Sequence, residues 1–332
     1  MKFGPVPVGQ AEGCLLAHSL QGAGRRIAKG TTLTPEDLQE LQQAGLTEVI
    51  VARLDPGDLH EDDAALRLAQ AMAPDAAALG LRISGAGAGR VNLYALAPGV
   101  TRVAAAQVGA INSVDPMISV ATVPDYHRVD AGGMIATIKI ISYAVPKAKL
   151  LVALAQAAGA IRVVLPHYGS ATLVETRVTE DMPSDKGRAA MAGRLDRMGL
   201  SLSPRVVVPH CAPEIATALR AAPGEVLFVL TGSATSDPAD VAPEAVRLAG
   251  GTVTRFGMPV DPGNLLFLGQ LGEKPVIGLP GCARSPALNG ADWVLERVVC
   301  GIDVTSADIA AMGVGGLLKE IPTRPRPRRD GE

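Results

Sequence analysis

Apolar residues gather in short blocks along the second half of the chain, and these blocks alternate between two spacings. Continuous apolar runs such as Glu225–Leu230 and Pro275–Leu279 are typical of buried strands, whereas Lys186–Met198 and Val241–Leu248 carry apolar residues at helical spacing. Alternating strands and helices predict a mostly parallel sheet with helices on both faces. The fold class expected for residues 146–301 is therefore α/β.

The first 57 residues follow a different pattern. Thr34 and Pro35 are typical of a helix start, and apolar residues at intervals of three follow them. An apolar run over Glu48–Ala52 then predicts a strand. We expect residues 1–57 to form a small α/β accessory domain.

Residues 58–145 are expected to form a β-rich middle domain that begins with one helix. An alanine-rich stretch over Glu61–Ala78 predicts this helix. The glycine-rich stretch Gly85–Gly89 precedes strands and does not link a strand to a helix, so we interpret it as a flexible connector and not as a phosphate loop. The strands expected in this domain are Val91–Ala95, Thr101–Val108, Met117–Val123 and Met134–Ser142.

Composition and charge mainly exclude classes of protein. The 332 residues are 48% apolar, and 31 basic against 33 acidic side chains give a net charge of −2, so no overall positive field would recruit nucleic acid or an anionic membrane. The longest uncharged apolar stretch, Leu150–Ile161, is shorter than the ~20 residues of a membrane-spanning helix. No apolar signal segment follows Met1, and the cysteines form no Cys-x-x-Cys pair. We therefore expect a cytoplasmic protein.

The strongest candidate for chemistry follows the apolar run Glu225–Leu230. A glycine and small hydroxyl residues between Thr231 and Ser236 leave room for a ligand to approach the backbone. The next helix is expected to begin near Asp240, where free backbone N–H groups would face an anion such as a phosphate. Asp240 could equally serve only as the cap of that helix, and the two roles are compatible.

Two further turns follow later strands. The turn Leu279–Ser285 precedes a final helix expected over Pro286–Cys300, and it combines exposed amides, a hydroxyl group and the cation of Arg284. Its alternative interpretation is an ordinary connection from strand to helix. The turn Asp261–Asn264 by itself indicates nothing beyond a β-turn.

Taken together, and in their order along the chain, the three turns resemble the molybdopterin-binding domain of the MoeA/MogA/gephyrin family. The resemblance covers about residues 145–301, and the N-terminal residues are similar to the small accessory domain of MoeA proteins. The matching motifs are Thr231-Gly232 with Asp240-Val241 and Pro243, the turn Pro262-Gly263-Asn264, Leu279-Pro280-Gly281 with Ser285, and Asp185-Lys186-Gly187 at a helix start.

The resemblance implies a MogA-like fold and a protein of molybdenum cofactor biosynthesis that binds molybdopterin, a pterin with a dithiolene and a terminal phosphate. Family members either adenylylate molybdopterin with Mg²⁺ and ATP or exchange AMP for molybdate. By motif position, Asp240 would be the acidic residue that organises Mg²⁺, with Asp237 as a second catalytic candidate. The residues implied to hold the nucleotide, the pterin or the phosphate are Thr231, Gly232, Ser233, Ser236, Asp185, Pro262, Gly263, Asn264, Pro280, Gly281, Arg284, Ser285 and His210.

Four positions depart from the family pattern. One is Thr235, where the MogA version of the loop has a glycine. Ser233 stands where a second glycine is usual, and Ala283 replaces the proline of the last turn. His210 ends the second strand where the family often has Val-Pro-Asp, which removes a hard oxygen ligand of the kind that Mg²⁺ prefers. Either Asp237 compensates for this loss, or the protein binds the pterin without adenylylating it. His210 either contacts phosphate or carries a proton, or is only a polar residue that ends a strand.

The leading hypothesis is a molybdopterin-binding protein of cofactor biosynthesis that catalyses adenylylation or molybdate insertion. One alternative is a non-catalytic module that serves a nucleotidyltransferase or molybdoenzyme partner, and the proline- and arginine-rich tail within residues 302–332 favours it slightly. The other alternative is a nucleotide phosphohydrolase similar to CinA-type proteins. The family is commonly dimeric or trimeric, so the resemblance also implies a homo-oligomer.

Overall fold

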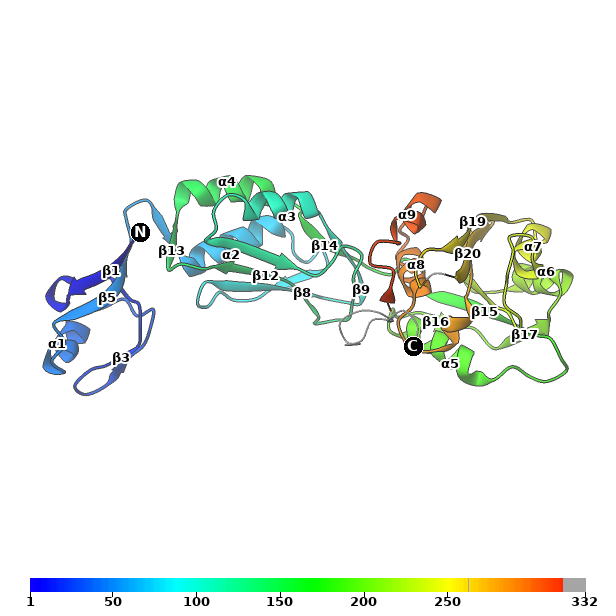
Figure 1. The fold of residues 1–332 in the computed structure, drawn as a ribbon, viewed down its shortest axis with the longest axis horizontal. Helices are drawn as coiled ribbons and strands as arrows, with labels where there is room; N and C mark the ends of the chain where they lie inside the picture. The colour runs from blue at the N-terminus through cyan, green and yellow to red at the C-terminus, as the bar shows by residue number, and fades with distance from the viewer. Residues whose placement is uncertain (262, 319–332) are drawn as a thin grey trace, which may run out of the picture. The chain divides into compact units, whose positions relative to one another are not determined.

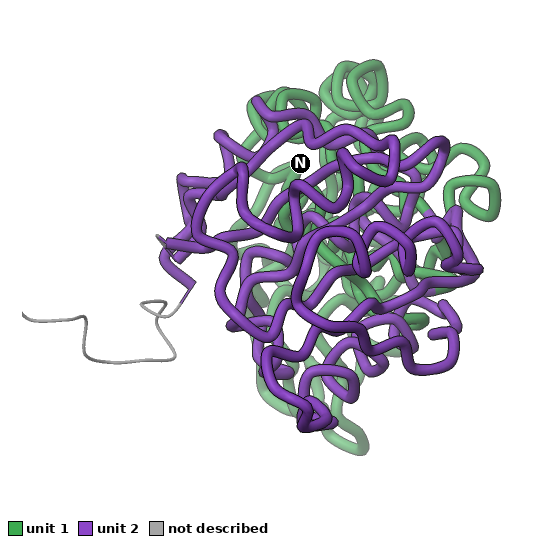
Figure 2. The backbone as a smooth tube through the Cα atoms, turned by 90° about the vertical axis from the view of Figure 1, so that its right-hand side faces the viewer, with its two compact units in different colours: residues 1–97, 101–164 green, residues 98–100, 165–332 purple. Residues whose placement is uncertain are grey.

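Figure 1 shows the fold of the chain in a computed structural model, which describes residues 1–261 and 263–318. The chain divides into two compact units, drawn in two colours in Figure 2. The first unit comprises residues 1–97 and 101–164, and the second comprises residues 98–100 and those from 165 onward. None of the helices in the described residues is long and apolar enough to cross a membrane.

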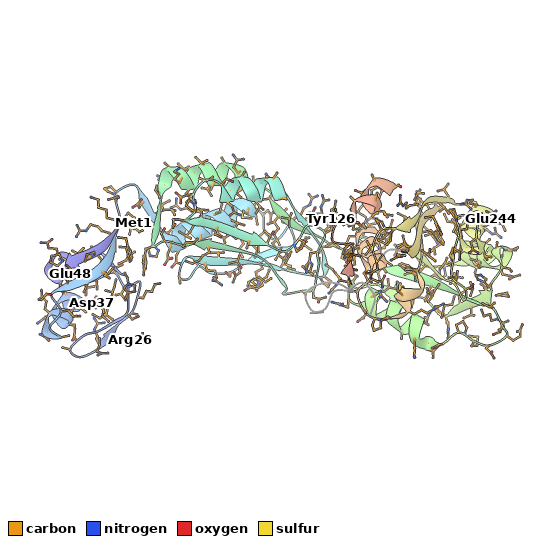
Figure 3. All side chains as sticks on the ribbon, viewed as in Figure 1. Met1, Arg26, Asp37, Glu48, Tyr126 and Glu244 are labelled. Carbon is orange, nitrogen blue, oxygen red and sulfur yellow. The ribbon has the colours of Figure 1, made fainter. Side chains whose placement is uncertain are left out.

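A small antiparallel sheet, in the order β1-β5-β2, and one helix begin the first unit. Helix α1 begins where the sequence predicts, because Thr34 caps it and Asp37, labelled in Figure 3, completes the capping box. The helix buries Leu38 and Leu41. The elements of this part are β1 (Lys2–Pro7), η1 (Val8–Gln10), β2 (Leu15–Leu16), β3 (Leu20–Gln21), β4 (Arg26–Ile27), α1 (Pro35–Gln43) and β5 (Glu48–Arg53).

A four-stranded antiparallel sheet, in the order β10-β12-β8-β7, contributes to the larger core of the first unit. Helices α2 and α4 pack their buried alanine and leucine residues into this core. The elements along this stretch of chain are β6 (Asp58–His60), α2 (Glu61–Met72), β7 (Leu81–Ile83), β8 (Arg90–Ala95), β9 (Gly99–Val103), α3 (Ala105–Asn112), β10 (Ile118–Thr122), β11 (Arg128–Val129), β12 (Met134–Ile140), β13 (Ala144–Pro146), α4 (Lys147–Ala157) and β14 (Ile161–Val164).

Two predictions for single elements of this region are wrong. The helix expected over Glu61–Ala78 ends at Met72, because Pro74 disfavours the helical conformation of the residue before it. The strand expected over Thr101–Val108 ends at Val103. The alanine-rich residues that follow have high helix propensity, and they form α3.

Helix α4 belongs to the first unit. Its residues Leu150, Ala153 and Ala157 are buried in the same core as those of α2. The sequence analysis assigned this helix to the domain at residues 146–301. The division of the chain into domains 1–57, 58–145 and 146–301 remains a prediction.

The second unit contains a seven-stranded sheet in the order β16-β15-β18-β21-β20-β19, with β17 also paired to β15. The pairs of β15 with β16, β17 and β18 and the pair β18–β21 are parallel, whereas β20 and β19 are antiparallel to their neighbours. Only Gly272 and Glu273 join β20 to β21, and a link this short connects antiparallel strands. The mostly parallel α/β fold is thus confirmed. The strands are β15 (Ser170–Arg177), β16 (Ser201–Leu202), β17 (Val206–Pro209), β18 (Val226–Leu230), β19 (Thr252–Met258), β20 (Asn264–Leu271) and β21 (Lys274–Gly278).

Helices cover both faces of this sheet. On one face, α6 (Ala212–Ala221) and α7 (Val241–Leu248) pack in one core with alternate residues of β18, among them Leu227. The next residues along the strand point to the opposite face, where α5 (Asp185–Asp196) lies against Leu230. The predicted arrangement with helices on both faces is confirmed.

The last long helix begins later than the sequence predicts. Instead of one helix over Pro286–Cys300, a 3₁₀ turn η2 (Gly281–Arg284) comes first, and helix α8 spans Gly290–Val299. Asn289 and Asp292 form a capping box, which sets the start of α8. A short helix, α9 (Ser306–Ala311), follows.

A pair of glycine substitutions tests the packing of the second unit. A Cβ atom at Gly278 of β21 would lie 2.0 Å from the buried ring of Phe267, whereas a Cβ atom at Gly193 of α5 would meet open space. We expect Gly278→Ala to destabilise the unit by about 1–3 kcal/mol, and Gly193→Ala to stabilise it by about 0.5–1 kcal/mol. Urea unfolding followed by the fluorescence of Trp293, the single tryptophan of the chain, measures both changes. Equal effects of the two variants would contradict the observed packing.

Candidate functional site

A cavity of about 1020 Å³, here called the main cavity, opens at the carboxyl ends of β15 and β18. The first turn of α5 and the 3₁₀ turn η2 contribute the rest of its wall. Ligands of open α/β sheets bind at this edge, outside the carboxyl ends of the strands. The lining includes Glu175, Thr176, Arg177, Val178, Asp181, Met182, Lys186, Leu230, Gly232, Gly281, Arg284 and Ser285.

Two glycines allow close backbone approaches beside the main cavity. The N–H of Gly232 donates to Oγ1 of Thr176 at 2.7 Å, and a Cβ atom at Gly232 would lie only 2.7 Å from the carbonyl oxygen of Thr176. A Cβ atom at Gly187 would lie 2.6 Å from Cδ2 of Leu230. A side chain at either position would therefore push the loop after β18 or helix α5 away from the strands.

The turn after β18 and the turn after β21 meet at a smaller hollow of about 150 Å³. Thr231 and Ser233 line it from the turn after β18, and Pro280 lines it from the turn after β21. Arg284 lines both this hollow and the main cavity. Its Nη2 donates to the carbonyl oxygen of Thr231 at 2.6 Å, so the guanidinium group joins the two turns.

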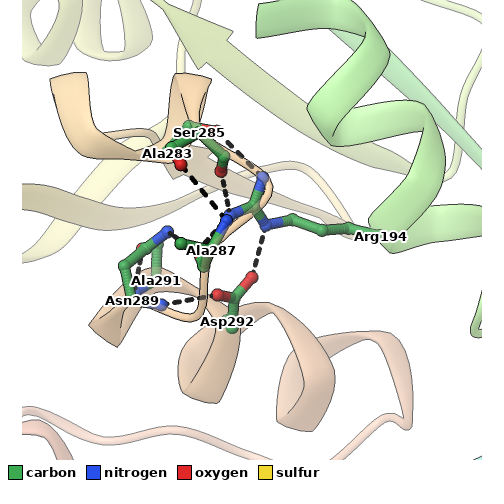
Figure 4. Close-up of polar contacts among 7 residues, drawn as sticks. All are labelled: Arg194, Ala283, Ser285, Ala287, Asn289, Ala291 and Asp292. Atoms are coloured by element: carbon green, nitrogen blue, oxygen red, sulfur yellow. Dashed lines mark hydrogen bonds and ion pairs between the residues drawn. The ribbon is translucent and has the colours of Figure 1, made fainter. Parts of the chain in front are cut away.

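Arg194 of α5 fastens the turn after β21 to the rest of the domain (Figure 4). Its guanidinium group forms an ion pair with Asp292. It also donates at 2.9, 2.8 and 3.1 Å to the carbonyl oxygens of Ala283, Ser285 and Ala287. Sequence patterns do not reveal Arg194, because its partners lie 89 to 98 positions away.

A second arginine, Arg205, neutralises a carboxylate of the main cavity. Its Nε and Nη2 donate to the two carboxylate oxygens of Glu175 at 2.8 and 3.1 Å, and its Nη1 pairs with Asp185 at 2.5 Å. The hydrogen bond with Glu175 is the largest of the effects that raise the pKa of the Arg205 guanidinium group above its usual value. Asp185, which the resemblance implied as a ligand-binding residue, thus pairs with Arg205 and does not line the main cavity.

Asp240 caps helix α7, as one of its two interpretations predicted. Its carboxylate accepts hydrogen bonds from the N–H groups of Ser236 at 2.8 Å and Val241 at 2.6 Å. These backbone hydrogen bonds hold the pKa of Asp240 below its usual value of 3.8. The side chain of Asp237 likewise accepts from the N–H of Ala239 at 2.8 Å. Neither acid lines the main cavity or the smaller hollow, and Ser236 does not line them either.

The surroundings of Asp240 give little support for a magnesium ion held by the protein. Both carboxylate oxygens of Asp240 already accept backbone hydrogen bonds, and His210 offers nitrogen where Mg²⁺ prefers oxygen. Within residues 1–261 and 263–318, no group of three or more His, Cys, Asp or Glu side chains could hold a metal ion. The role of Asp240 as a metal ligand remains a prediction from the resemblance.

His210 follows the end of β17 and lies outside the main cavity. Its Nδ1 is 2.9 Å from Oγ1 of Thr176, the hydroxyl group that also accepts from Gly232. Together with Arg177 and Glu180, it lines a separate hollow of about 390 Å³. The imidazole is therefore hydrogen-bonded to Thr176, which lines the main cavity, but does not line that cavity itself.

The described residues of the third turn do not line the main cavity. Pro262 lies outside the described residues. Asn264 is buried at the start of β20, where its Oδ1 accepts from the N–H of Leu266 at 3.2 Å. Gly263 has a φ of 97°, a conformation that favours glycine. Neither Gly263 nor Asn264 lines the main cavity or the smaller hollow.

Comparison with known protein families identifies this part of the chain. Residues 171–298 match the family model of a probable molybdopterin binding domain. Residues 171–298 thus form a domain of this family. The resemblance inferred from the three turns is thus confirmed for these residues. Residues 5–53 match a second family, a domain of unknown function (DUF8806), and no curated protein matches the chain.

The solved structures similar to the chain include proteins of molybdopterin and molybdenum cofactor biosynthesis. The molybdopterin biosynthesis moea protein from Pyrococcus horikosii is 11% identical, with a TM-score of 0.32, over 90% of this chain and 75% of that chain. Molybdenum cofactor biosynthesis protein B is 18% identical, with a TM-score of 0.32, over 41% of this chain and 96% of that chain. A molybdenum cofactor biosynthesis protein from Pyrococcus furiosus is 12% identical, with a TM-score of 0.24, over 91% of this chain and 66% of that chain.

Replacing Arg194 tests how the turn after β21 is held in the molybdopterin-binding domain. We expect Arg194→Ala to cost about 3–5 kcal/mol, because Asp292 becomes a buried charge without its partner. Exposed Arg220 donates to the carbonyl oxygen of Leu248 on another part of the domain, so Arg220→Ala is a matched control with an effect within about 0.5 kcal/mol. Hydrogen-exchange mass spectrometry should show faster exchange over residues 281–287 in the Arg194 variant alone. Unchanged exchange there would argue against this anchor.

The pH dependence of stability tests the capping role of Asp240. Its pKa is lower in the folded chain than its usual value of 3.8, so the charged carboxylate stabilises the fold above that value. The contribution is lost as the pH falls through the folded-state pKa. Asp240→Asn keeps an oxygen acceptor but does not titrate, so the difference between the free energies of unfolding of the two proteins should be constant well above pH 3.8 and shrink as the pH falls below that value. Trp293 fluorescence in urea measures them, and a difference independent of pH would exclude the carboxylate charge as the cause.

Proposed function

We propose that the molybdopterin-binding domain holds molybdopterin in the main cavity and serves molybdenum cofactor biosynthesis as a binding protein. The observation that supports this most is the meeting of two turns around Arg284 at the carboxyl edge of the sheet. Backbone N–H groups of tight turns favour phosphate. The terminal phosphate would therefore lie between the two turns, with Arg284 as its counter-charge, while the N–H of Gly232 stays with Thr176.

The charges of the cavity wall suit an anionic ligand. Lys186 lies in the first turn of α5, and no hydrogen bond from its ammonium group to another described residue occurs. Arg205 neutralises Glu175. Asp181 is then the remaining acid of the lining, against the cations of Lys186 and Arg284 and that of Arg177, which pairs with Glu180.

Aliphatic side chains supply the apolar part of the wall. Val178 and Met182 are 64% and 62% exposed and line the main cavity together with Leu230. A ligand that covered them would remove apolar surface from water, which is favourable by roughly 25 cal/mol per Å². None of the described residues that line the cavity is aromatic, so the pterin would rest on aliphatic side chains and backbone and not on stacked rings.

Adenylylation with Mg²⁺ and ATP is the second candidate, because a cavity of about 1020 Å³ leaves room for a nucleotide beside the pterin. For Asp240 to bind Mg²⁺ in that reaction, its carboxylate would have to coordinate the ion while it also accepts the two backbone hydrogen bonds of the turn. Molybdate insertion and nucleotide hydrolysis rest on the resemblance alone. A nucleotidyltransferase or molybdoenzyme partner, a homo-oligomer and a cytoplasmic location remain expectations from the sequence.

Anaerobic titration of the full chain with molybdopterin tests the proposal. We expect saturable binding that Lys186→Ala weakens about tenfold or more, because a charge-assisted contact to phosphate is lost. Lys149→Ala is the matched control, since Lys149 is an exposed helical lysine of the first unit. If molybdopterin does not bind, or if the two variants weaken binding equally, the proposed site is wrong. Release of pyrophosphate from Mg-ATP that depends on molybdopterin would favour adenylylation over binding alone.

A further inference from the structure

A continuous line of hydrogen bonds runs across the carboxyl ends of three neighbouring strands. The Nδ1 atom of His210, after β17, lies 2.9 Å from Oγ1 of Thr176 on β15, and the N–H of Gly232, after β18, donates to the same oxygen at 2.7 Å. Thr176 is only 1% exposed. The backbone N–H of His210 also donates to the carbonyl oxygen of Arg177 at 2.9 Å, which holds the imidazole beside β15.

We propose that His210 is a positioning residue for the ligand site. It orients the hydroxyl group of Thr176, and Thr176 in turn fixes the backbone of Gly232 at the wall of the main cavity. Thr176 and Gly232 line that cavity, whereas His210 does not, so the imidazole acts through them. The effect on molybdopterin binding rests on the proposed function, but the hydrogen bonds themselves do not.

The donors and acceptors set the direction of this line. The N–H of Gly232 can only donate, so Oγ1 of Thr176 accepts from it. The hydroxyl proton of Thr176 then needs an acceptor, and Nδ1 of His210 is in place to accept it. His210 therefore carries its proton on Nε2. If Nδ1 were protonated instead, Oγ1 would accept twice, and its own proton would be buried without the acceptor that His210 otherwise supplies.

Gly232 lies so close to β15 that a small shift of Thr176 would move the backbone of Gly232. A Cβ atom at Gly232 would lie 2.7 Å from the carbonyl oxygen of Thr176 and 3.0 Å from Cγ2 of Val178, so the loop follows β15 closely. A threonine side chain has more than one allowed rotamer. The two hydrogen bonds of the Thr176 hydroxyl group, one to Gly232 and one to His210, select one of these rotamers. Gly232 begins the turn that contains Ser233, so releasing the hydroxyl group would loosen the wall that faces the phosphate.

Two pairs of variants separate an orienting role from mere packing. His210→Ala removes the acceptor, whereas His210→Asn keeps a polar atom at the place of Nδ1. Thr176→Val removes the hydroxyl group at nearly constant shape, whereas Thr176→Ser keeps it. His18→Ala, at an exposed histidine of the first unit, is the control for loss of an imidazole. Trp293 fluorescence checks that each protein is folded.

The deciding measurement is the exchange rate of the Gly232 amide proton, followed by NMR on the full chain without ligand. We expect exchange about fivefold faster or more in His210→Ala and Thr176→Val, and close to the original rate in His210→Asn, Thr176→Ser and His18→Ala. The ¹⁵N shift of the imidazole should identify Nδ1 as the nitrogen without a proton. Unchanged exchange in folded His210→Ala, no rescue by His210→Asn, or a protonated Nδ1 would each overturn the proposal.

Titration with molybdopterin links this line of hydrogen bonds to the ligand. We expect the dissociation constant to rise about fivefold or more in His210→Ala and to recover in His210→Asn. Failure of the unchanged protein to bind molybdopterin would reject the proposed function, while the exchange rates would still decide the role of His210. Normal binding by His210→Ala together with fast exchange of Gly232 would overturn the positioning role in binding.

Discussion

The parallel pairing of β15 with β17 and β18 is the constraint on which the ligand site depends. Thr176 pairs with Val208 of β17, and the residue before Thr176 pairs with the last residue of β18. Because strands of one direction end at the same edge of a sheet, His210 and Gly232 arrive beside Thr176 from 34 and 56 positions away. The close approach of these strand ends also explains why the second residue of the loop after β18 is a glycine, Gly232.

Where loops leave the sheet, their backbone carbonyl groups lose the hydrogen bonds that a neighbouring strand would supply. Arginine side chains donate hydrogen bonds to these groups instead. Arg194, Arg205 and Arg284 each donate to carbonyl oxygens of loops around the main cavity. A guanidinium group has five N–H donors in a fixed plane, so one side chain can satisfy several irregular carbonyl groups. Arg194 and Arg205 also pair with mostly buried carboxylates. Desolvation offsets much of the attraction in such pairs, so they contribute more to the position of the loops than to stability.

Local sequence patterns predicted elements and turns, but not the contacts between them. Helix Val241–Leu248 has the predicted bounds, because its cap and its apolar side lie within the segment itself. The strand expected over Thr101–Val108 failed because short apolar runs rich in alanine suit a helix as well as a strand. Gly232 and Arg284 were identified from the residue types of two short turns. Arg194 was missed because its role depends on carbonyl groups far along the chain, which no local pattern marks.

The charges of the site favour an anion held by the protein's own cations. Glu175 is neutralised by its arginine partner, and Lys186 and Arg284 line the cavity. Transfer of an adenylyl group would need a metal to neutralise the phosphates of ATP as well. The acid that the resemblance assigns to that task, Asp240, already uses both oxygens to hold the turn after β18. Each of these oxygens accepts one backbone hydrogen bond, so the observed role of the carboxylate is to shape the turn that a phosphate-binding role requires.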